Sequence, residues 1–390
     1  MFSGRLPSDL VPNRLARAVD ERRAAGGPII DLTETNPTRA RLVYPPDFLA
    51  PLGDPRALTY VPEPFGLMSA RRAVRSDYGR RGLRVAAERI VLTASTSEAY
   101  SLLFKVLCDG GDEVLVPRPS YPLFDHLTRL DAVTPVHYDL EYQGRWSIDL
   151  ASVERAWSPR VRVVLAVSPN NPTGSRLTPT EVESLTAMCA ARGAAMIVDE
   201  VFADYDLEPA RAARRADVLG THEALVFSLG GLSKTIGLPQ AKLAWLACGG
   251  PDSLVSAAID RLEIAADTYL SVSTPVQLAA ADLLERGAVV REQIQQRIVS
   301  NYQWLTAATS GASACRVLAA DGGWYAVIQV PSLSAEEELV MKLLTVDGVL
   351  VHPGYFFDFP TESHLIASLL VHESAFREGV ARVLRHFDCQ

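Results

Sequence analysis

The stretch Ser228-Leu-Gly-Gly-Leu-Ser-Lys-Thr-Ile-Gly-Leu-Pro-Gln-Ala-Lys242 carries a lysine, Lys234, among small and hydroxyl-bearing residues. The apolar run before it, residues 224–227, is typical of a buried strand that ends in a tight turn. An amine that burial removes from water loses part of its preference for the charged form and becomes a nucleophile. The stretch therefore predicts a reactive buried amine, while a solvated surface lysine is the alternative that this segment alone leaves open.

Three further segments place polar side chains where an apolar run ends. One is Ser168-Pro-Asn-Asn-Pro-Thr-Gly174, and another is Met196-Ile-Val-Asp199, where a carboxylate ends the run. The third, Thr93-Ala-Ser-Thr-Ser-Glu-Ala99, is a hydroxyl-rich turn between an apolar run and a helical pattern. In open α/β sheets, ligands bind at the edge where the strands end, so we expect these segments to meet there.

Short apolar runs without polar alternation recur between residues 67 and 270, with helical patterns between them. Strands buried on both faces have this composition, which indicates an α/β unit with a parallel or mixed sheet. A long helical pattern at 275–307 then leads to a second, α+β unit, and residues 9–26 predict an amphipathic arm helix. The expected strands lie at 90–92, 114–116, 163–167, 196–198, 225–227, 243–246, 323–330, 349–351 and 365–371.

Composition narrows the class of protein. The chain has 390 residues, of which 48% are hydrophobic, enough for one large or two ordinary domains. A net charge of −8 argues against a nucleic-acid partner. No apolar run has the length of a membrane span, and the N-terminus lacks the apolar core of a signal peptide. The five cysteines are scattered without metal-binding spacing, so we expect reduced thiols, no metal site and a cytoplasmic protein.

The order of these features resembles that of the fold type I pyridoxal-phosphate enzymes, specifically the class I/II aminotransferases. The order is the hydroxyl turn, an aromatic residue, Asn-Pro-Thr-Gly, an aspartate and the lysine. The resemblance implies an aspartate-aminotransferase-like fold, with a large domain on a mostly parallel sheet flanked by helices and a smaller α+β domain. It also implies pyridoxal 5'-phosphate as cofactor and a homodimer. On this basis we expect an N-terminal arm and part of the small domain at 1–48, the large cofactor-binding domain at 49–272 and the small C-terminal domain at 273–390.

The resemblance assigns roles to the residues that match the family's motif. Lys234 would form the internal aldimine with the cofactor and then move a proton between the substrate carbon and C4′. Asp199 would pair with the pyridine nitrogen, and Asn171 would donate a hydrogen bond to the ring oxygen O3′. The structural alternatives are a helix cap or an ion pair for Asp199 and an ordinary tight turn for Asn171.

The remaining contacts to the cofactor follow from the same resemblance. Thr96 and Ser97 would offer backbone and hydroxyl donors to its phosphate at a helix N-terminus, with Ser233 and Lys242 as further candidates. Tyr121 matches the aromatic position that stacks on the ring, although a core tyrosine is the alternative. Tyr60 matches the family's tyrosine that contacts the cofactor phosphate of the partner subunit, which requires a homodimer.

Two cofactor contacts depart from the family. Lys242 stands where most relatives carry arginine, which keeps the charge but loses the planar fork of the guanidinium. Phe202 stands where many relatives have a tyrosine that also bonds O3′. Tyr205, three residues further on, is the candidate to substitute for it.

The largest departure concerns the substrate. Relatives carry a C-terminal arginine that clamps the α-carboxylate of the substrate with two parallel hydrogen bonds. The matching stretch here is Leu365-Ile-Ala-Ser-Leu-Leu-Val-His372, which contains no arginine. Arg39 is a candidate replacement and Asn36 a further candidate for substrate binding, because the turn Asn36-Pro-Thr38 resembles the family's substrate-facing N-terminal loop.

The sequence therefore predicts an aminotransferase that uses a small-molecule amino donor and a keto-acid acceptor. Its substrate would be an amino acid or an amino-acid derivative, with unusual specificity because the arginine is missing. Since a fold does not fix a reaction, β-elimination (a C–S lyase), decarboxylation or cyclisation on the same cofactor is the alternative. A pyridoxal-phosphate-binding protein without turnover is a more remote one.

Overall fold

The computed structural model describes residues 2–208, 216–311, 313–361 and 363–388. Its largest sheet contains, in spatial order, β2 (Ile90–Thr93), β9 (Ala244–Gly249), β8 (Val226–Gly231), β7 (Ala195–Asp199), β6 (Val161–Val167), β3 (Glu113–Arg118), β4 (Thr134–Tyr142) and β5 (Trp146–Ile148). Strands β8, β7, β6, β3 and β4 are parallel to one another, whereas β9 is antiparallel to both of its neighbours and β5 is antiparallel to β4. The expectation of a mostly parallel α/β sheet is confirmed.

The central strands are hydrophobic on both faces because helices cover both sides of the sheet. Along β6 and β7, Val164 and Met196 belong to one apolar core, whereas their neighbours Val163 and Ile197 belong to another. Alternate side chains of a strand point to opposite faces, so an uninterrupted apolar run fits a sheet that is covered twice.

The covering helices divide between these two cores. On one face, α3 (Thr96–Leu107) packs against α4 (Phe124–Leu130) and α8 (Asp252–Asp267). On the other face, α2 (Met68–Arg80) packs against α9 (Thr274–Arg286), and α6 (Pro179–Arg192) contributes Leu185 to the same core. A capping box between Thr178 and Glu181 begins α6, and Gly193 ends it in the left-handed conformation (φ 67°).

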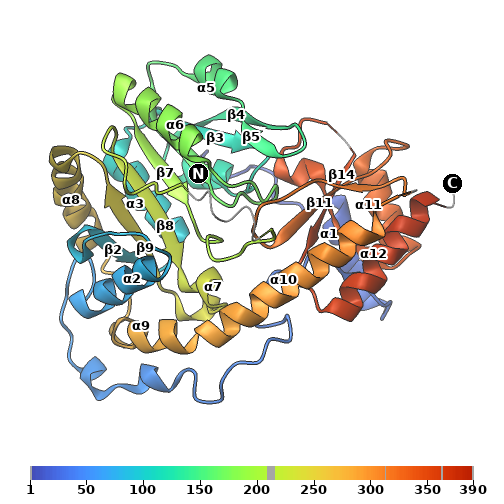
Figure 1. Ribbon diagram of the computed structural model, residues 1–390, viewed down its shortest axis with the longest axis horizontal. Coiled ribbons are helices and arrows are strands. Elements are labelled where there is room, and N and C mark those ends of the chain that lie inside the picture. The colour runs from blue at the N-terminus through green and yellow to red at the C-terminus, as the bar shows by residue number, and fades with distance from the viewer. Residues whose placement is uncertain (1, 209–215, 312, 362, 389–390) are drawn as a thin grey trace.

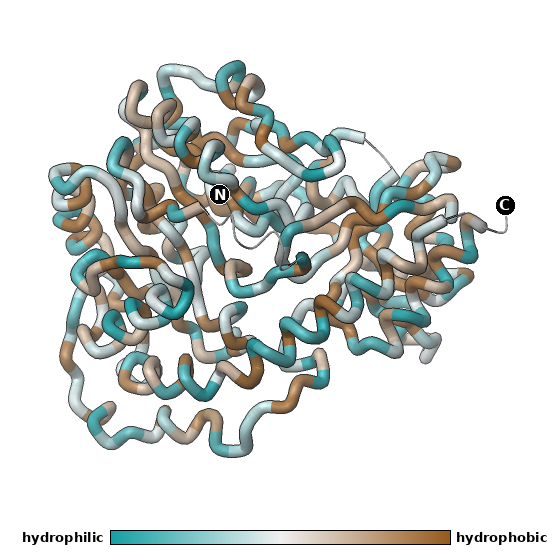
Figure 2. The backbone as a smooth tube through the Cα atoms, in the orientation of Figure 1, coloured by the Kyte–Doolittle hydropathy of each residue, from teal (hydrophilic) through white to brown (hydrophobic). Residues whose placement is uncertain are grey.

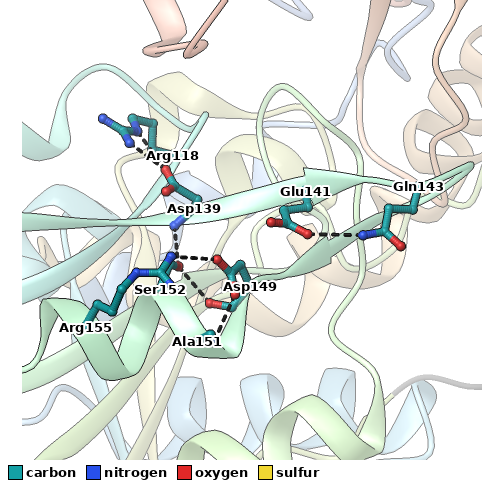
Figure 3. A network of polar contacts seen from close by, with 8 residues as sticks. All are labelled: Arg118, Asp139, Glu141, Gln143, Asp149, Ala151, Ser152 and Arg155. Atoms are coloured by element: carbon teal, nitrogen blue, oxygen red, sulfur yellow. Dashed lines mark hydrogen bonds and ion pairs between the residues drawn. The ribbon is translucent and has the colours of Figure 1, made fainter.

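Polar contacts fix the edge of the large sheet beside α5 (Leu150–Ala156), as Figure 3 shows. The side chain of Asp149 caps α5 by accepting from the Ala151 N–H at 2.9 Å, and the Ser152 hydroxyl accepts from the Asp139 N–H of β4 at 2.8 Å. Arg118 at the end of β3 donates to the Asp139 carboxylate at 2.7 Å. The sequence did not predict β4 or β5; β5 is the edge strand, and β4 beside it is only partly buried.

A second unit lies beside the large sheet (Figure 1). Its four-stranded sheet contains, in spatial order, β10 (Arg316–Val317), β11 (Tyr325–Gln329), β14 (His364–Ser368) and β13 (His352–Pro353), and β1 (Ile30–Asp31) pairs separately with β12 (Val349–Leu350). Three helices complete this small unit: α1 (Arg14–Ala24), α11 (Glu336–Thr345) and α12 (Glu373–Asp388). Its core joins N-terminal and C-terminal residues, such as Leu32, Trp324 and Phe376. The limits of the two domains at residues 48 and 272 stay predictions.

The expected long helix at 275–307 is two helices, α9 and α10 (Ala288–Ala308), which meet at Gly287. A Cβ atom at Gly287 would lie 2.5 Å from Cβ of Ile236, so the close approach of the two segments requires glycine here. The long helix α10, which alternates teal and brown in Figure 2, spans from the large sheet to the small unit.

The N-terminal helix is also shorter than the expected 9–26, because α1 begins only after its cap, Asn13. Leu10, expected on its apolar face, is 81% exposed. Short 3₁₀ turns occur at Ala50–Gly53, Pro55–Leu58, Ala87–Arg89, Pro239–Ala241 and Gly354–Phe357, and α7 (Leu232–Thr235) follows β8. Within the described ranges, none of the helices combines the length and the apolar character that crossing a membrane requires.

Candidate active site

A cavity of about 310 Å³ lies where β6, β7 and β8 end and α3 begins. This volume falls within the range of roughly 300–1,000 Å³ that is typical of small-molecule sites. The structure brings seven of the predicted site residues to its wall: Thr96, Ser97, Tyr121, Asn171, Asp199, Ser233 and Lys234. They meet there because the strand ends of a parallel sheet share one edge.

Lys234 presents its amine to this cavity from α7, which directly follows β8. Its Nζ lies 4.9 Å from the ring centre of Trp324 and 5.6 Å from that of Phe202. Burial lowers the pKa of this amine to about 8, although the Asp199 carboxylate acts in the opposite direction. A substantial fraction of Lys234 is therefore neutral near pH 8, as a nucleophile and proton carrier must be.

Tyr205 supports the lysine turn from behind the cavity. Its buried hydroxyl donates to the backbone carbonyl of Lys234 at 2.6 Å. The hydroxyl is thus held by the backbone of the turn, and Tyr205 is not among the residues that line the cavity. It does not replace the hydroxyl that Phe202 lacks.

Asp199 ends β7 with its carboxylate in the cavity wall. One oxygen accepts from the Tyr100 hydroxyl at 2.9 Å and the other accepts from the Val201 N–H at 3.0 Å. Burial raises the pKa of Asp199 to about 6, whereas these two hydrogen bonds and the Lys234 amine lower it. A cationic group of a ligand would stabilise this desolvated carboxylate further.

The turn that carries Asn171 is fixed by its neighbours. Asn170 donates to the carbonyl of Pro119 at 3.1 Å and accepts from the Ser120 hydroxyl at 2.8 Å, which ties the turn to the loop of Tyr121. Gly174 has φ 69°, and a Cβ atom there would lie 2.6 Å from Cβ of Ala320. Among the described residues, Oδ1 of Asn171 has no hydrogen-bond partner although it is buried.

The part of the cavity at the start of α3 is rich in hydroxyl groups. Ser95 caps α3 by accepting from the Glu98 N–H at 3.1 Å, and the first residues of this helix, Thr96 and Ser97, lie in the cavity wall together with Ser233. The first N–H groups of a helix have no partner inside it and carry a partial positive charge. This end of the cavity therefore suits a phosphate group.

Four predicted contacts do not line the cavity: Asn36, Arg39, Tyr60 and Lys242. The Asn36 side chain accepts from the N–H and the hydroxyl of Thr38, and Arg39 is exposed. Lys242 is exposed with φ 53°, and Tyr60 is 72% exposed. The roles assigned to these four residues stay predictions.

Sequence reasoning missed several residues of the wall, among them Thr35, Ser95, Tyr100 and Tyr325. Tyr100 follows Thr96 by four residues on α3, so helical spacing could have placed both on one face. For Thr35 and Tyr325 no local pattern was available, because the fold of the small unit brings them to the cavity.

These groups fit pyridoxal phosphate. Lys234 offers an amine for its aldehyde, Asp199 a carboxylate for its ring nitrogen, Asn171 a side-chain amide that can donate through its nitrogen, and the start of α3 a site for its phosphate. Tyr121, whose ring meets Phe124 edge-on at 5.8 Å, offers an aromatic surface.

The comparisons with known proteins identify the family. The family model described as aminotransferase class I and II matches residues 29–377. An alanine aminotransferase of Mycobacterium tuberculosis is 28% identical over 77% of this chain and 71% of its own length. The glutamate-pyruvate aminotransferase of Escherichia coli is 27% identical over 77% of this chain and 75% of its own.

Solved structures show the same fold. An alanine aminotransferase from Pyrococcus furiosus superimposes with a TM-score of 0.88 at 22% identity, covering 100% of both chains. A Thermus thermophilus aspartate aminotransferase double mutant gives 0.82 at 21% identity, covering 99% of each. The chain therefore belongs to the class I and II aminotransferases, a pyridoxal-phosphate-dependent family of enzymes that transfer amino groups.

Proposed function

We propose that this aminotransferase acts on an amino acid or an amino-acid derivative, with a keto acid as acceptor and Lys234 as the residue that holds the cofactor. The observation that carries the proposal is the pairing of two shifted groups in one cavity: an amine with a pKa of about 8 and a carboxylate with a pKa of about 6. Groups whose pKa values are displaced by burial in a shared cavity are typical of catalytic sites.

When bound, pyridoxal phosphate supplies an electron sink for charge that develops on the carbon bearing the amino group. The neutral amine of Lys234 can accept a proton at that carbon and, once charged, return it. Asp199 would stabilise a positive charge on the ring nitrogen, and its contacts with Tyr100 and Val201 keep the carboxylate oriented. The apolar neighbours Phe202 and Trp324 keep water away from the amine.

The test is the half-reaction. The purified enzyme, loaded with pyridoxal phosphate and given an amino donor alone, is expected to convert the cofactor to its amine form, with loss of visible absorption and release of one keto acid per site. Release of ammonia, carbon dioxide or a cyclic product without that conversion would instead identify the elimination, decarboxylation or cyclisation alternatives.

We propose in addition that substrate recognition does not rely on an α-carboxylate clamp. Of the described residues in the cavity wall, Lys234 is the one that carries a cationic group. Ile366, within the stretch where relatives carry the arginine, is fully buried in β14. Arg377 pairs with Glu373 at 3.6 Å along α12, with 48% of its side chain exposed.

Arg39→Ala is therefore expected to leave the KM for amino donors within about twofold of the wild type. Simple α-amino acids are expected to be poor donors in both proteins, because a lost charge-assisted pair of hydrogen bonds weakens binding by roughly 30- to 150-fold. Steady-state kinetics with glutamate, alanine and an aromatic amino acid measure both effects. A sharp rise in KM for Arg39→Ala would assign the clamp to Arg39.

We also propose a homodimer in which Tyr60 contacts the cofactor phosphate of the partner subunit. The part of the chain that leads into α2, residues 49–61, runs along the outside of the large unit (Figure 1) and exposes apolar side chains, including Leu58 at 92% and Tyr60 at 72%. Exposed apolar side chains gathered on one segment favour an interface, and two-fold dimers are the commonest soluble assembly.

Sedimentation is expected to give a dimer at working concentration. Tyr60→Phe is expected to weaken cofactor binding without dissociating the dimer. The loss of one charge-assisted hydrogen bond corresponds to roughly tenfold in affinity. A fully active monomer would contradict the proposal.

A further inference from the structure

Tyr325 brings the small unit to the wall of the cavity. It begins β11, in the small sheet, while Asn171 follows β6 of the large sheet. The Tyr325 side chain lies beside those of Thr35 and Asn171, close enough for both to act on the pKa of its hydroxyl, and all three residues line the cavity. This is a contact between two units at the site itself.

The strand pairing of the small unit fixes the positions of the two residues that it contributes to the cavity wall, Thr35 and Tyr325. Ser368 of β14 lies opposite Tyr325 in the ladder. The Ser368 hydroxyl donates to the carbonyl of Glu34 at 2.7 Å, and its N–H donates to that of Leu32 at 2.7 Å. Thr35 is therefore tied to the same strand pair that carries Tyr325, so the two hydroxyl groups share one rigid support.

Aromatic neighbours hold the Tyr325 ring in place. Phe202 meets it edge-on, with ring centres 6.2 Å apart and an angle of 90°, and Phe357 packs at 6.3 Å. Neither neighbour offers a polar group, so the phenol oxygen is directed to Thr35 and Asn171.

Burial raises the pKa of the Tyr325 hydroxyl to about 12, and the neighbouring side chains of Thr35 and Asn171 act in the opposite direction. The amide of Asn171 can donate only through its nitrogen, and its oxygen has no partner within the described ranges. The Tyr325 hydroxyl therefore keeps its proton at neutral pH, and the cavity that it lines is where an acceptor for this proton would lie.

We propose that Tyr325 is a ligand-binding residue that donates its hydroxyl proton to an acceptor oxygen of the molecule in the cavity, with Thr35 and Asn171 orienting it. This inference rests on the proposed function. Two sources share the required chemistry: the ring oxygen of the cofactor and a carboxylate or carbonyl oxygen of the substrate.

The test compares Tyr325→Phe with Tyr142→Phe in the cofactor-loaded enzyme. Tyr142 is the matched control, because its hydroxyl also joins the two units, accepting from the Ala319 N–H at 3.0 Å, but lies outside the cavity wall. Two quantities are measured: the pH midpoint of the visible absorption of the bound cofactor, and the binding of a slow or unreactive amino-donor analogue by difference absorbance.

If the acceptor is the cofactor's ring oxygen, Tyr325→Phe raises the pH midpoint by about one unit, because a donated hydrogen bond stabilises the deprotonated oxygen. If the acceptor belongs to the substrate, the midpoint is unchanged and binding of the analogue weakens roughly 10- to 100-fold. Tyr142→Phe changes neither quantity. The proposal is overturned if Tyr325→Phe matches the wild type in both measurements, or if Tyr142→Phe produces the same changes.

Thr35→Val gives a second route that does not depend on the tyrosine variant folding well. It is expected to change the same quantity in the same direction as Tyr325→Phe, by a smaller amount. The double variant is expected to behave like Tyr325→Phe alone, since Thr35 acts through Tyr325; additive effects would contradict this. Failure of the wild type to bind pyridoxal phosphate would instead refute the proposed function.

Discussion

Replacing Lys234 with alanine is expected to reduce amino transfer by at least 10²- to 10⁴-fold, the range associated with a positioned proton-transfer group. The lost amine is the one whose pKa burial lowers to about 8, and its neighbours Phe202 and Trp324 offer no group that could exchange a proton in its place. Initial rates with a saturating donor measure the effect, and circular dichroism checks the fold.

Lys342→Ala is the control, because this lysine is exposed on α11 and lies outside the cavity wall. It is expected to retain wild-type activity. Borohydride reduction of the cofactor-loaded wild type, followed by peptide mapping, should place the label on Lys234. A label on Lys242 or Lys105 would show that the wrong amine has been assigned.

Asp199→Asn is expected to have two opposite effects. Activity should fall on the order of 100-fold or more, because a neutral amide cannot hold a positive charge on the cofactor ring. The protein without cofactor should become more stable, because burial raises the pKa of Asp199 from 3.8 to about 6 and so disfavours its charged form in the folded state. A difference of this size corresponds to roughly 3 kcal/mol in the free energy of unfolding.

The pH dependence of this gain in the free energy of unfolding tests whether the buried charge of Asp199 causes it. Above about pH 6 the carboxyl group is charged in both states, and the folded state bears the full cost of burying it. As the pH falls from about 6 toward 3.8, the folded state binds the proton first, and the stability of the wild type approaches that of Asp199→Asn. Denaturant unfolding of both proteins at pH 8 and pH 4 measures the change. An equal difference at both pH values would mean that desolvation of the carboxylate is not its source.

The sequence predicted site residues correctly where a reactive or polar side chain stands at the end of a strand. Lys234, Asp199 and Asn171 each follow an apolar run, and parallel strands bring such positions to one edge whatever the details of packing. The fold class followed from the same runs, since only a sheet covered on both faces hides them. Local pattern alone sufficed for these features.

Features that depend on distant segments could not be predicted in this way. Thr35 and Tyr325 reach the cavity through the pairing of β14 with β11 and its contacts with the N-terminal segment, which no local periodicity encodes. The junction between α9 and α10 was missed because the apolar spacing continues across Gly287, where the backbone packs closely against Ile236.

The junction between α9 and α10 also connects the small unit to the turn that carries the reactive amine. Ile236 stands two residues after Lys234, and it touches the point from which α10 extends toward the small unit. The N-terminal end of α10 therefore packs against the segment that follows the lysine turn. A side chain at position 287 would push the two segments apart, because its Cβ atom would collide with Ile236. A displacement of the small unit that moved α10 would therefore press on Ile236, next to the turn that carries the amine.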